Sequence, residues 1–367
     1  MEFDFDKKTG VYVHIPFCRS RCVYCAFCSS VDEYLQKDYC RALVREIDER
    51  VCGEVDSVYI GGGTPSVLER GLITEILSAV RSRANVYKDS EITVEANPDS
   101  CTDEFLDEIV SAGVTRLSLG VQSLNSDVLS RAGRRHDSDG ARKAVRRALS
   151  HGLKNISCDL MIGLEGQTQS DIIRAVEELS YLGVKHISLY ALSVEEGTPL
   201  YARGYSVDAD CAADDYAAAY EKLKECGFER YEVSNFCKNG KFSRHNFGYW
   251  LRAPYIGVGA SAHSFDGLIR SYNTSNIASY INGDREESRA TVTKSEALEE
   301  YIMLGLRTAR GIKFSELNAL GGEYWAEKKH AEIDELSSRG FIEKTADGIR
   351  ICENAYYVMN EIIVKLI

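Results

Sequence analysis

The sequence predicts an α/β protein built around a parallel sheet that is either open and doubly wound or curved into a barrel. Three observations lead to this prediction. Apolar, β-branched runs alternate with segments of helical periodicity, glycine-rich and polar motifs directly follow the runs, and three closely spaced cysteines follow the first run. Because ligands bind at the carboxyl ends of parallel strands, these motifs predict a binding site at that edge of the sheet.

Strands and helices alternate regularly through the first part of the chain. The candidate strands are residues 10–15, 57–60, 91–95, 116–121, 155–162 and 186–192. The segments with apolar residues at helical spacing are 32–51, 67–81, 103–112, 137–150, 169–182 and 210–226. Wherever a helix connects two successive strands, we expect the strands to be parallel and the connection to be a right-handed crossover.

The alternation ends beyond residue 228. Residues 231–236, 244–250 and 257–263 have the composition of strands and loops appended to the sheet. Helical segments follow at 295–308, 314–320 and 323–339, and then comes a hairpin at 341–351 that turns at 346–348. Together with a final helix, this order predicts a small winged-helix-like C-terminal domain that begins near residue 289.

Composition excludes several classes of protein. The chain has 367 residues, of which 44% are hydrophobic and 27% charged, as in an ordinary globular protein. Its net charge of -12 disfavours binding to phosphate backbones, so we expect no nucleic-acid partner. We also see no secretory signal and no transmembrane run. The 12 cysteines are too sparse for a disulfide scaffold, which indicates a reducing, cytoplasmic location.

We expect the chemistry at Cys18, Cys22 and Cys25, whose C-x3-C-x2-C spacing brings three thiols onto one loop. Cysteine thiolates hold iron–sulfur clusters, and a four-iron cluster held by three of them keeps one iron open to another ligand. A zinc site and ordinary packing residues are the alternatives. A second ligand pair at zinc spacing is not evident, which favours the cluster.

Other candidate ligand groups lie at the ends of strands or within them, except for Arg134, which belongs to a basic stretch that is largely helical. They are Gly61 to Pro65, Glu95, Gln122, Arg134 and Asp159. Glycines allow close approach of a ligand to the backbone, and a buried carboxylate needs a partner. Each residue by itself is equally consistent with a structural role. Together they could bind the hydroxyls and the carboxylate of a small polar ligand such as S-adenosylmethionine (SAM), which can also chelate an open iron.

Seven motifs carry a family resemblance. They are Tyr12 to Phe17 leading into the cysteines, Gly61 to Pro65, Leu119 to Ser123, Gly133 to His136, Asp159 to Leu164, Tyr231 to Phe236 and His245 to Trp250. In these motifs, which span nearly the whole chain, the sequence resembles radical SAM proteins. More narrowly, it is similar to the oxygen-independent coproporphyrinogen oxidase group.

The resemblance implies a partial (β/α)6 TIM-like barrel with a [4Fe-4S] cluster on Cys18, Cys22 and Cys25 and SAM on the fourth iron. It also implies that one-electron reduction of the cluster can cleave SAM to methionine and a 5′-deoxyadenosyl radical. The residues that match SAM-contacting positions are Tyr12, Gly62, Thr64 and Glu95. Those that match positions lining SAM sites in the oxidase, including a second SAM, are Tyr24, Gly63, Gln122, Arg134 and Asp159.

Three features separate the oxidase from the heme-chaperone branch of this group. The oxidase has a further cysteine where this chain has Phe27, and it has a long amino-terminal extension where only 17 residues precede Cys18 here. Residues 245–250 also fit an H-N-x-x-Y-W motif associated with heme in the chaperones. His245 could ligate heme iron, and Tyr249 and Trp250 could pack on a porphyrin face, although a lone histidine is more often structural.

We therefore expect a cytoplasmic heme chaperone that binds heme, SAM and a [4Fe-4S] cluster, and that passes heme to hemoproteins such as respiratory enzymes. Residues 1–288 are expected to form the radical SAM core and residues 289–367 the C-terminal domain, in a chain that could form a homodimer. The alternative is an oxygen-independent coproporphyrinogen oxidase, which decarboxylates two propionates. A tRNA-modifying radical SAM enzyme is disfavoured by the negative charge.

Overall fold

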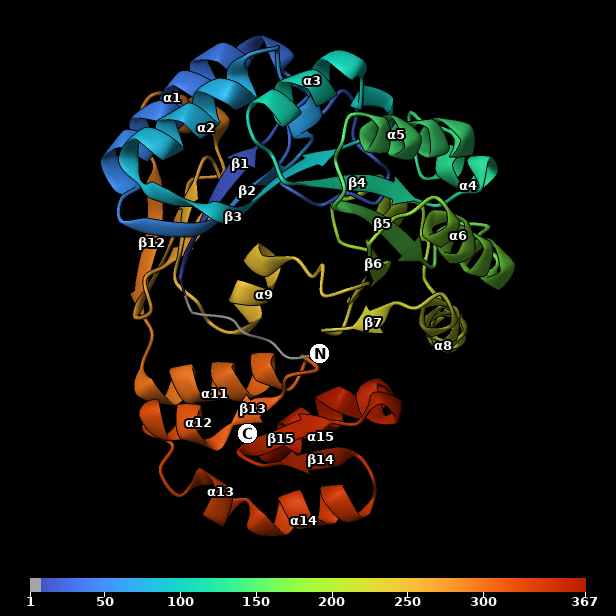
Figure 1. The fold of residues 1–367 in the computed structure, drawn as a ribbon, viewed down its shortest axis with the longest axis vertical. Helices are drawn as coiled ribbons and strands as arrows, with labels where there is room; N and C mark the ends of the chain where they lie inside the picture. Colours follow the sequence, from blue (N-terminus) through green and yellow to red (C-terminus); the bar gives the residue numbers. More distant parts are fainter. Residues whose placement is uncertain (1–7) are drawn as a thin grey trace.

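The computed structural model describes residues 8–367, and one large sheet organises most of them. The six predicted strands are confirmed, and they lie parallel and side by side in chain order. Their bounds are β1 Thr9–Ile15, β2 Glu54–Gly62, β3 Asn85–Ala96, β4 Arg116–Gln122, β5 Ile156–Ile162 and β6 His186–Ala191. In Figure 1 they form an open arc with helices on its convex side, which confirms the partial barrel.

The predicted crossover helices are also present. They are α1 Gln36–Arg50, α2 Leu72–Arg83, α3 Asp103–Ser111, α5 Ser138–Ser150, α6 Gln169–Tyr181 and α8 Ala209–Glu225, with the unpredicted short helices α4 Ser126–Arg131 and α7 Pro199–Ala202. The sequence pattern placed the start of α2 too early, because residues 65–67 form a 3-10 turn and Gly71 takes φ 96° before the helix. No helix within residues 8–367 is long and apolar enough to cross a membrane.

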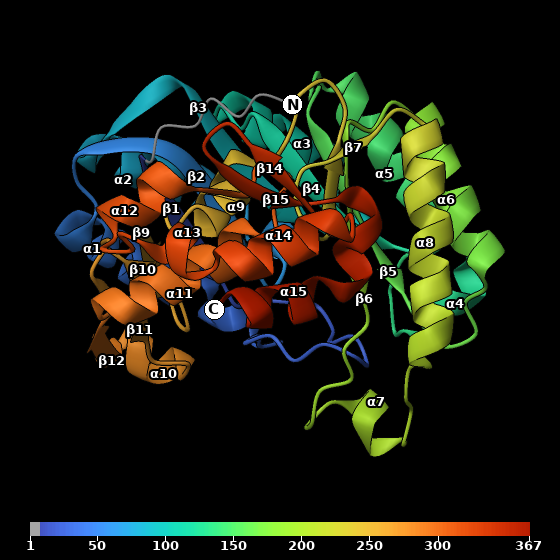
Figure 2. The same ribbon diagram turned by 90° about the horizontal axis from the view of Figure 1, so that it is seen from below.

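The sheet continues beyond the barrel at both ends. Next to β6 lie two short antiparallel strands, β8 Asn235–Cys237 and β7 Glu229–Arg230. On the other side, β9 Tyr255–Val258 pairs in parallel with β1. It is followed outward by β10 His263–Phe265, β11 Ile269–Asn273 and β12 Glu286–Thr291, with α10 Ile277–Ile281 between the last two strands. Figure 2 shows this extension on the opposite side of the molecule from α8.

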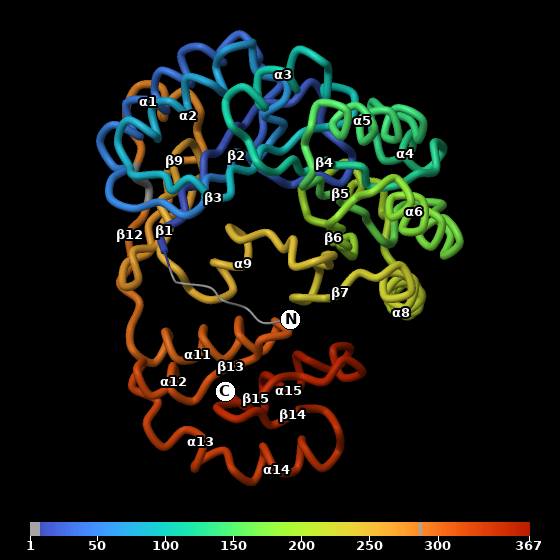
Figure 3. Tube along the Cα trace, viewed as in Figure 1, coloured from blue at the N-terminus to red at the C-terminus, as the bar shows by residue number. Residues whose placement is uncertain are grey.

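Residues 244–250 form a helix, α9 Arg244–Trp250, so the sequence-based expectation of a strand or loop there is wrong. The Ser243 side chain caps this helix by accepting a hydrogen bond from the backbone amide of Asn246. Figure 3 shows α9 within the concave side of the arc, facing the inner side of the strands. The sequence did not predict this helix because a helix that is so short and is buried in the barrel has no amphipathic repeat.

Side chains alternate along the strands between the convex face of the sheet, which packs against the helices, and the concave face, which lines the inside of the barrel. On β1, Val11, Val13 and Ile15 are fully buried, in the same hydrophobic cluster as residues of α1 and α2. The intervening Tyr12 and His14 therefore point to the concave side, because successive side chains of a strand point to opposite faces. The convex face thus supplies the apolar core, and the concave face is free to carry polar groups.

The last part of the chain has its own core. Its elements are α11 Lys294–Gly305, β13 Ile312–Lys313, α12 Phe314–Ala319, α13 Trp325–Lys328, α14 His330–Ser338, β14 Ile342–Thr345, β15 Gly348–Ile351 and α15 Met359–Leu366. The predicted hairpin is β14 and β15, whereas the predicted helix at 323–339 is divided at Lys329, whose ψ of 12° is not helical. The first buried apolar residue of this core is Tyr301. The boundary at 288/289 remains a prediction, and it falls within β12.

Two arginines join this region to the barrel. The Arg230 guanidinium lies over the Tyr356 ring at 3.4 Å and over the Tyr220 ring at 4.7 Å. Arg252, just after α9, donates to a Glu300 carboxylate oxygen on α11 at 2.8 Å. The C-terminal domain in Figure 1 therefore lies against the open side of the arc through contacts with both β7 and the segment after α9.

A buried carboxylate fixes the sheet extension to the barrel. Glu46 of α1 has no exposed surface, and four groups donate hydrogen bonds to it. One oxygen accepts from Arg50 at 2.6 Å and Asn273 at 2.8 Å, and the other accepts from the Gly259 amide at 2.9 Å and the Tyr280 hydroxyl at 2.6 Å. Helix α1 is thereby tied to β11, α10 and the loop after β9.

We expect Glu46→Ala to lower the free energy of unfolding by about 3 kcal/mol, because it leaves buried donors and Arg50 without their acceptor. The matched control is Glu49→Ala on the same helix, whose ion pair with Arg285 is exposed and should contribute at most about 1 kcal/mol. Urea denaturation monitored by circular dichroism measures both. Equal effects of the two substitutions would contradict the role assigned to Glu46.

Candidate functional site

The cysteine loop follows β1 and is closed at its base. The Cys18 amide donates to the Ser30 carbonyl at 2.9 Å, and the Ser30 amide donates to the Pro16 carbonyl at 2.6 Å. Between these points the chain carries Cys18, Cys22 and Cys25, all half-buried and none in a disulfide. The loop is therefore a defined structure that presents three free thiols at the carboxyl end of the first strand.

The glycine-rich turn after β2 is bonded directly to this loop. The Gly63 amide donates to the Ile15 carbonyl at 2.7 Å, and the Thr64 amide donates to the Phe17 carbonyl at 2.8 Å. Gly62 takes φ 112°, and a Cβ there would come within 2.5 Å of the His14 ring. Only glycine allows the turn to come this close, so the sequence Gly61-Gly62-Gly63 has a steric cause.

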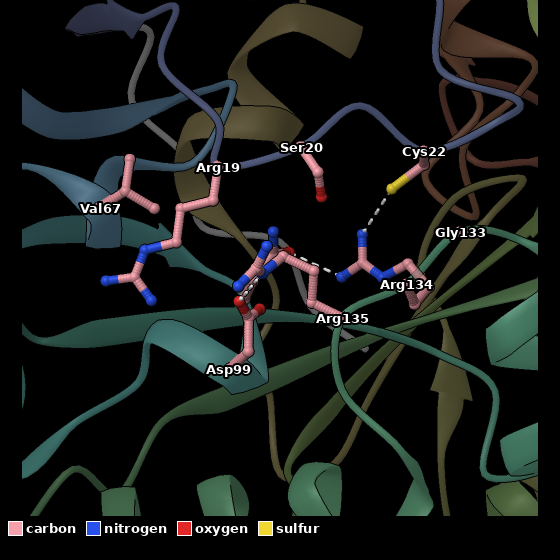
Figure 4. A pocket seen from close by; sticks show the side chains of 9 residues that line it. Arg19, Ser20, Cys22, Val67, Asp99, Gly133, Arg134 and Arg135 are labelled. Carbon is pink, nitrogen blue, oxygen red and sulfur yellow. Dashed lines mark hydrogen bonds and ion pairs between the residues drawn. The ribbon is translucent and has the colours of Figure 1, made fainter. Parts of the chain in front are cut away.

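A hydrogen-bonded series links two of the three cysteines through neighbouring strands. Cys18 Sγ shares a hydrogen bond with Thr64 Oγ1 at 3.3 Å, and Asn97 Nδ2 donates to the same oxygen at 3.1 Å. Arg134 donates from Nη2 to Asn97 Oδ1 at 2.7 Å and from Nη1 to Cys22 Sγ at 3.3 Å. Figure 4 shows Arg134 directed at Cys22 from the segment that contains Gly133 and Arg135. The loop thus has fixed partners after β2, β3 and α4.

Asn97 is not among the residues that the sequence predicted for the site. Its position two residues beyond Glu95 was the available signal. The amide accepts from Arg134 on one side and donates to Thr64 on the other, which only a group with both a donor and an acceptor can do. Asn97 is the residue that joins the two halves of the series.

Gln122 lies close to Arg134 because β4 is distorted at its end. The pairing of β4 with β5 changes register between Leu119 and Gln122, and Gln122 takes the left-handed φ of 66°. A Cβ at Gly120 would lie 3.1 Å from Gln122 Nε2 and 3.2 Å from Arg134 Nη2. Arg134 also donates to the Gly120 carbonyl at 2.5 Å. The structure thus brings Gln122 and Arg134 together, as the sequence predicted.

Two predicted acidic residues lie on the inner face of the barrel. Glu95 accepts from the Tyr59 hydroxyl at 2.6 Å and from the Gly62 amide at 3.1 Å. Burial raises the pKa of Glu95 to about 7, against the opposing effect of the Tyr59 hydrogen bond. Burial likewise raises the pKa of Asp159 to about 6, although the hydrogen bond to Ser188 lowers it. Both groups can therefore gain or lose a proton near neutral pH.

Tyr12 and Tyr24 complete the predicted SAM set. The Tyr12 hydroxyl lies 3.0 Å from His14 Nδ1, and the other ring nitrogen of His14 lies 3.1 Å from the Cys28 carbonyl. Burial raises the pKa of the Tyr12 and Tyr24 hydroxyls above the usual range. Tyr12 thus connects the inner face of β1 to the end of the cysteine loop, and Tyr24 lies on the loop itself.

The predicted heme residues of α9 lie away from the cysteine loop, toward the start of β1. His245 is 4% exposed, and its ring stacks on Tyr59 at 5.2 Å. Its Nδ1 lies 2.9 Å from Ser57 Oγ, and its Nε2 lies 2.8 Å from the Tyr249 hydroxyl. Burial lowers the pKa of His245 to about 3. Both ring nitrogens are therefore engaged within the protein, and Trp250 packs against a separate cluster around Tyr231.

The donor set on the cysteine loop fits an iron–sulfur cluster. Within the described chain, no three His, Cys, Asp or Glu side chains converge on one point as a single-ion site requires. A four-iron cluster has different needs, because each thiolate binds its own iron atom. Burial raises the pKa of the Cys18 and Cys25 thiols, and the Arg134 guanidinium opposes this by favouring the thiolates. Three free thiols beside the half-buried Arg134 suit a four-iron cluster.

Comparison with known proteins agrees with this description. A model of the radical SAM superfamily matches residues 12–179, and a model of the HemN C-terminal domain matches residues 292–358. The solved structure of coproporphyrinogen III oxidase (HemN) from Escherichia coli superposes with a TM-score of 0.85 over 98% of this chain and 89% of that one. Its sequence identity of 19% shows a shared fold only.

Curated relatives are closer in sequence. The heme chaperone HemW of Bacillus subtilis is 33% identical over 96% of this chain and 97% of its own. HemW of Escherichia coli is 32% identical with the same coverage. Radical S-adenosyl methionine domain-containing protein 1 of Bos taurus mitochondria is 33% identical over 98% of this chain and 88% of its own.

The barrel, its cysteine loop and these matches define a radical SAM protein. Within that class the chain belongs to the HemW family, since its similarity to these proteins is nearly full-length on both sides. The sequence-based resemblance is therefore confirmed.

The pKa of Glu95 predicts a pH-dependent stability. Because the folded protein holds this proton up to a pH of about 7 while the unfolded chain releases it near 4.5, the contribution of the carboxyl is fully present below pH 4.5. It is lost as the pH rises through about 7, and in full it amounts to about 3 kcal/mol. Urea unfolding of cluster-free protein at about pH 5 and about pH 8 measures the loss. Glu95→Gln, which stays neutral, should lose less stability than the wild type over that interval, and an equal loss would contradict the prediction.

Proposed function

We propose that this protein is a heme chaperone that binds heme and delivers it to hemoproteins such as respiratory enzymes. It acts in the cytoplasm, carries a SAM-chelated [4Fe-4S] cluster, and can assemble as a homodimer. The main support is the nearly full-length similarity to proteins named heme chaperone HemW. That similarity coincides with a cysteine loop whose three thiols are free of disulfides, and two of them, Cys18 and Cys22, are linked through Thr64, Asn97 and Arg134.

Cys18, Cys22 and Cys25 are the proposed cluster ligands. When bound, the cluster and SAM would supply one-electron reductive cleavage of SAM. The protein holds the loop closed between Pro16 and Ser30, so the spacing of the thiols is set before any cluster is inserted. Arg134 contributes a positive charge beside Cys22, to whose sulfur it donates a hydrogen bond at 3.3 Å.

The proposed SAM contacts line the carboxyl edge of the barrel around this loop. They are Tyr12, Gly62, Thr64 and Glu95 for the SAM on the cluster, and Tyr24, Gly63, Gln122, Arg134 and Asp159 for the remaining SAM positions. Glu95 and Asp159 supply hydroxyl-binding oxygens, and Arg134 supplies a carboxylate-binding fork. The close approach of the turn at Gly62 and Gly63 gives a ligand access to backbone groups.

Phe27 argues for a chaperone over an oxidase. It occupies the position of the further cysteine of the oxidase, and its side chain is 72% exposed beside the third cluster ligand. An exposed phenylalanine cannot supply the thiol chemistry of that cysteine. We also propose that His245, Tyr249 and Trp250 contribute to heme binding, and the observed packing of α9 favours a positioning role.

The cluster assignment predicts that a combined Cys18, Cys22 and Cys25 to Ala variant loses its iron and sulfide after anaerobic reconstitution. Each alanine removes one thiolate ligand, and no other thiol of the loop occupies an equivalent position. Cys28→Ala on the same loop is the control and should retain the brown chromophore. Iron and sulfide analysis with absorbance spectra measures both. Wild-type iron content in the triple variant would refute the assignment.

The function assignment predicts that the reconstituted wild-type protein binds hemin, seen as a shifted Soret band. The same preparation should not convert coproporphyrinogen when SAM and a reductant are supplied, because it lacks the further cysteine of the oxidase. Product analysis by chromatography measures conversion. Turnover to protoporphyrinogen would replace the chaperone proposal by the oxidase alternative.

A further inference from the structure

Heme iron needs an axial ligand with a free donor atom, and imidazole is a common choice. The chain has seven histidines, all within residues 8–367. Six of them have ring nitrogens in hydrogen bonds or ion pairs: His14, His136, His151, His186, His245 and His330. For His263 the described residues provide no such partner, and its side chain is exposed. His263 is therefore the one histidine of the described residues that has neither ring nitrogen in a hydrogen bond or ion pair and is also exposed.

His263 belongs to an ordered group of side chains on one face of the sheet extension. In the antiparallel pairing of β10 with β11, His263 lies opposite Tyr272 and Phe265 lies opposite Arg270. Residues two apart on a strand share a face, so all four side chains project to the same side. The His263 ring stacks on the Tyr272 ring with centroids 5.2 Å apart and planes at 25°. Stacking on Tyr272 thus restricts the rotation of the His263 side chain and orients its imidazole.

The neighbouring edge strand leaves room beside this pair. Ser288 of β12 lies opposite Tyr272, and Ala290 lies opposite Arg270. Both side chains are small, and Ala290 is exposed. The other face of β11 is occupied, because Asn273 donates to the buried carboxylate of Glu46. On the face that carries His263, the side chains of the edge strand next to it are small, which suits a flat ligand there.

Arg270 gives this face a positive group. Its guanidinium lies 4.4 Å above the Phe265 ring and 2.8 Å from a Glu300 oxygen, and its side chain is 38% exposed. Glu300 also accepts from Arg252, so one carboxylate is shared by two guanidinium groups. The excess positive charge matches a ligand that carries carboxylates. Heme has two propionates at one edge of a planar macrocycle with iron at its centre.

The face is connected to both functional regions of the protein. Cys28 Sγ donates to the Ser275 carbonyl at 3.6 Å, which brings the cysteine loop against the chain just after β11. Ring contacts run from Tyr249 of α9 to Tyr255 at 4.6 Å and from Tyr255 to Phe265 at 6.4 Å. A ligand on His263 would therefore lie between the cysteine loop and the residues that α9 positions.

We propose that His263 is the axial ligand of the heme iron, with Tyr272 beside the macrocycle and Arg270 toward the propionates. This inference rests on the proposed function, because it assigns a site to the cargo of a heme chaperone. It gives α9 a supporting role, in which His245 and Tyr249 hold Tyr255 and the sheet extension in place without touching iron.

The test uses full-length reconstituted protein and two probes, hemin and metal-free protoporphyrin IX. His263→Ala should bind hemin at least roughly tenfold more weakly, since even groups that only orient a metal ligand contribute that much. Its Soret band should shift, and added imidazole should restore the wild-type spectrum. Binding of protoporphyrin IX, which has no iron to ligate, should stay as in the wild type. His330→Ala on α14 is the matched control, because it removes another exposed histidine.

Each outcome decides between separate claims. Weaker hemin binding with unchanged protoporphyrin binding supports His263 as the iron ligand. Wild-type hemin affinity and spectrum in His263→Ala overturn this assignment while the heme-chaperone proposal stands. Loss of both probes to the same extent also overturns it, because the residue would then act on the site and not on the iron. Failure of the wild-type protein to bind hemin overturns the proposed function itself.

Discussion

The hydrogen-bonded series from Cys18 through Thr64, Asn97 and Arg134 to Cys22 is the constraint on which the site depends. Its members come from the loop after β1, the turn after β2, the end of β3 and the segment after α4. A sheet that splayed or slipped by one residue would separate them, since register decides which side chains face inward. The positions of Cys18 and Cys22 relative to one another therefore depend on the pairing of the first strands of the barrel.

The interior of the barrel is polar, and this explains the course of the chain between β7 and β9. Arg116 is 1% exposed and lies 3.9 Å from Glu91, whose carboxylate also accepts from the His245 amide at 3.3 Å. His186 bonds to the Tyr231 hydroxyl at 2.8 Å. Buried charges and imidazoles need partners, and the segment that contains α9 provides them. A motif that the sequence links to heme therefore has a structural explanation that sequence patterns do not reveal.

That this chain shares its fold with the oxidase does not imply that the two proteins share a function. The two structures superpose with a TM-score of 0.85, yet the cysteine loop of this chain presents the exposed side chain of Phe27 two residues after Cys25. Function depends on the chemistry of a few side chains placed on a scaffold. Here the scaffold supplies a cluster loop and a SAM-binding edge, while the sheet extension beyond β1 offers a face with an imidazole, aromatic rings and a guanidinium. Cargo binding and cluster chemistry can then occupy neighbouring regions of one protein.

The sequence by itself determined the six parallel strands, the crossover helices and the cysteine loop, because periodicity and cysteine spacing are local properties of the chain. It also singled out Gln122, at the end of a predicted strand, and Arg134, in one of the family motifs. Only the tertiary structure decided that Asn97 joins Arg134 to Thr64 and that α9 is a helix inside the barrel. It also decided that both ring nitrogens of His245 have partners, whereas within residues 8–367 those of His263 have none. These facts depend on contacts between residues far apart in the chain. A local sequence pattern cannot predict which distant side chain will be the hydrogen-bond partner of a buried group.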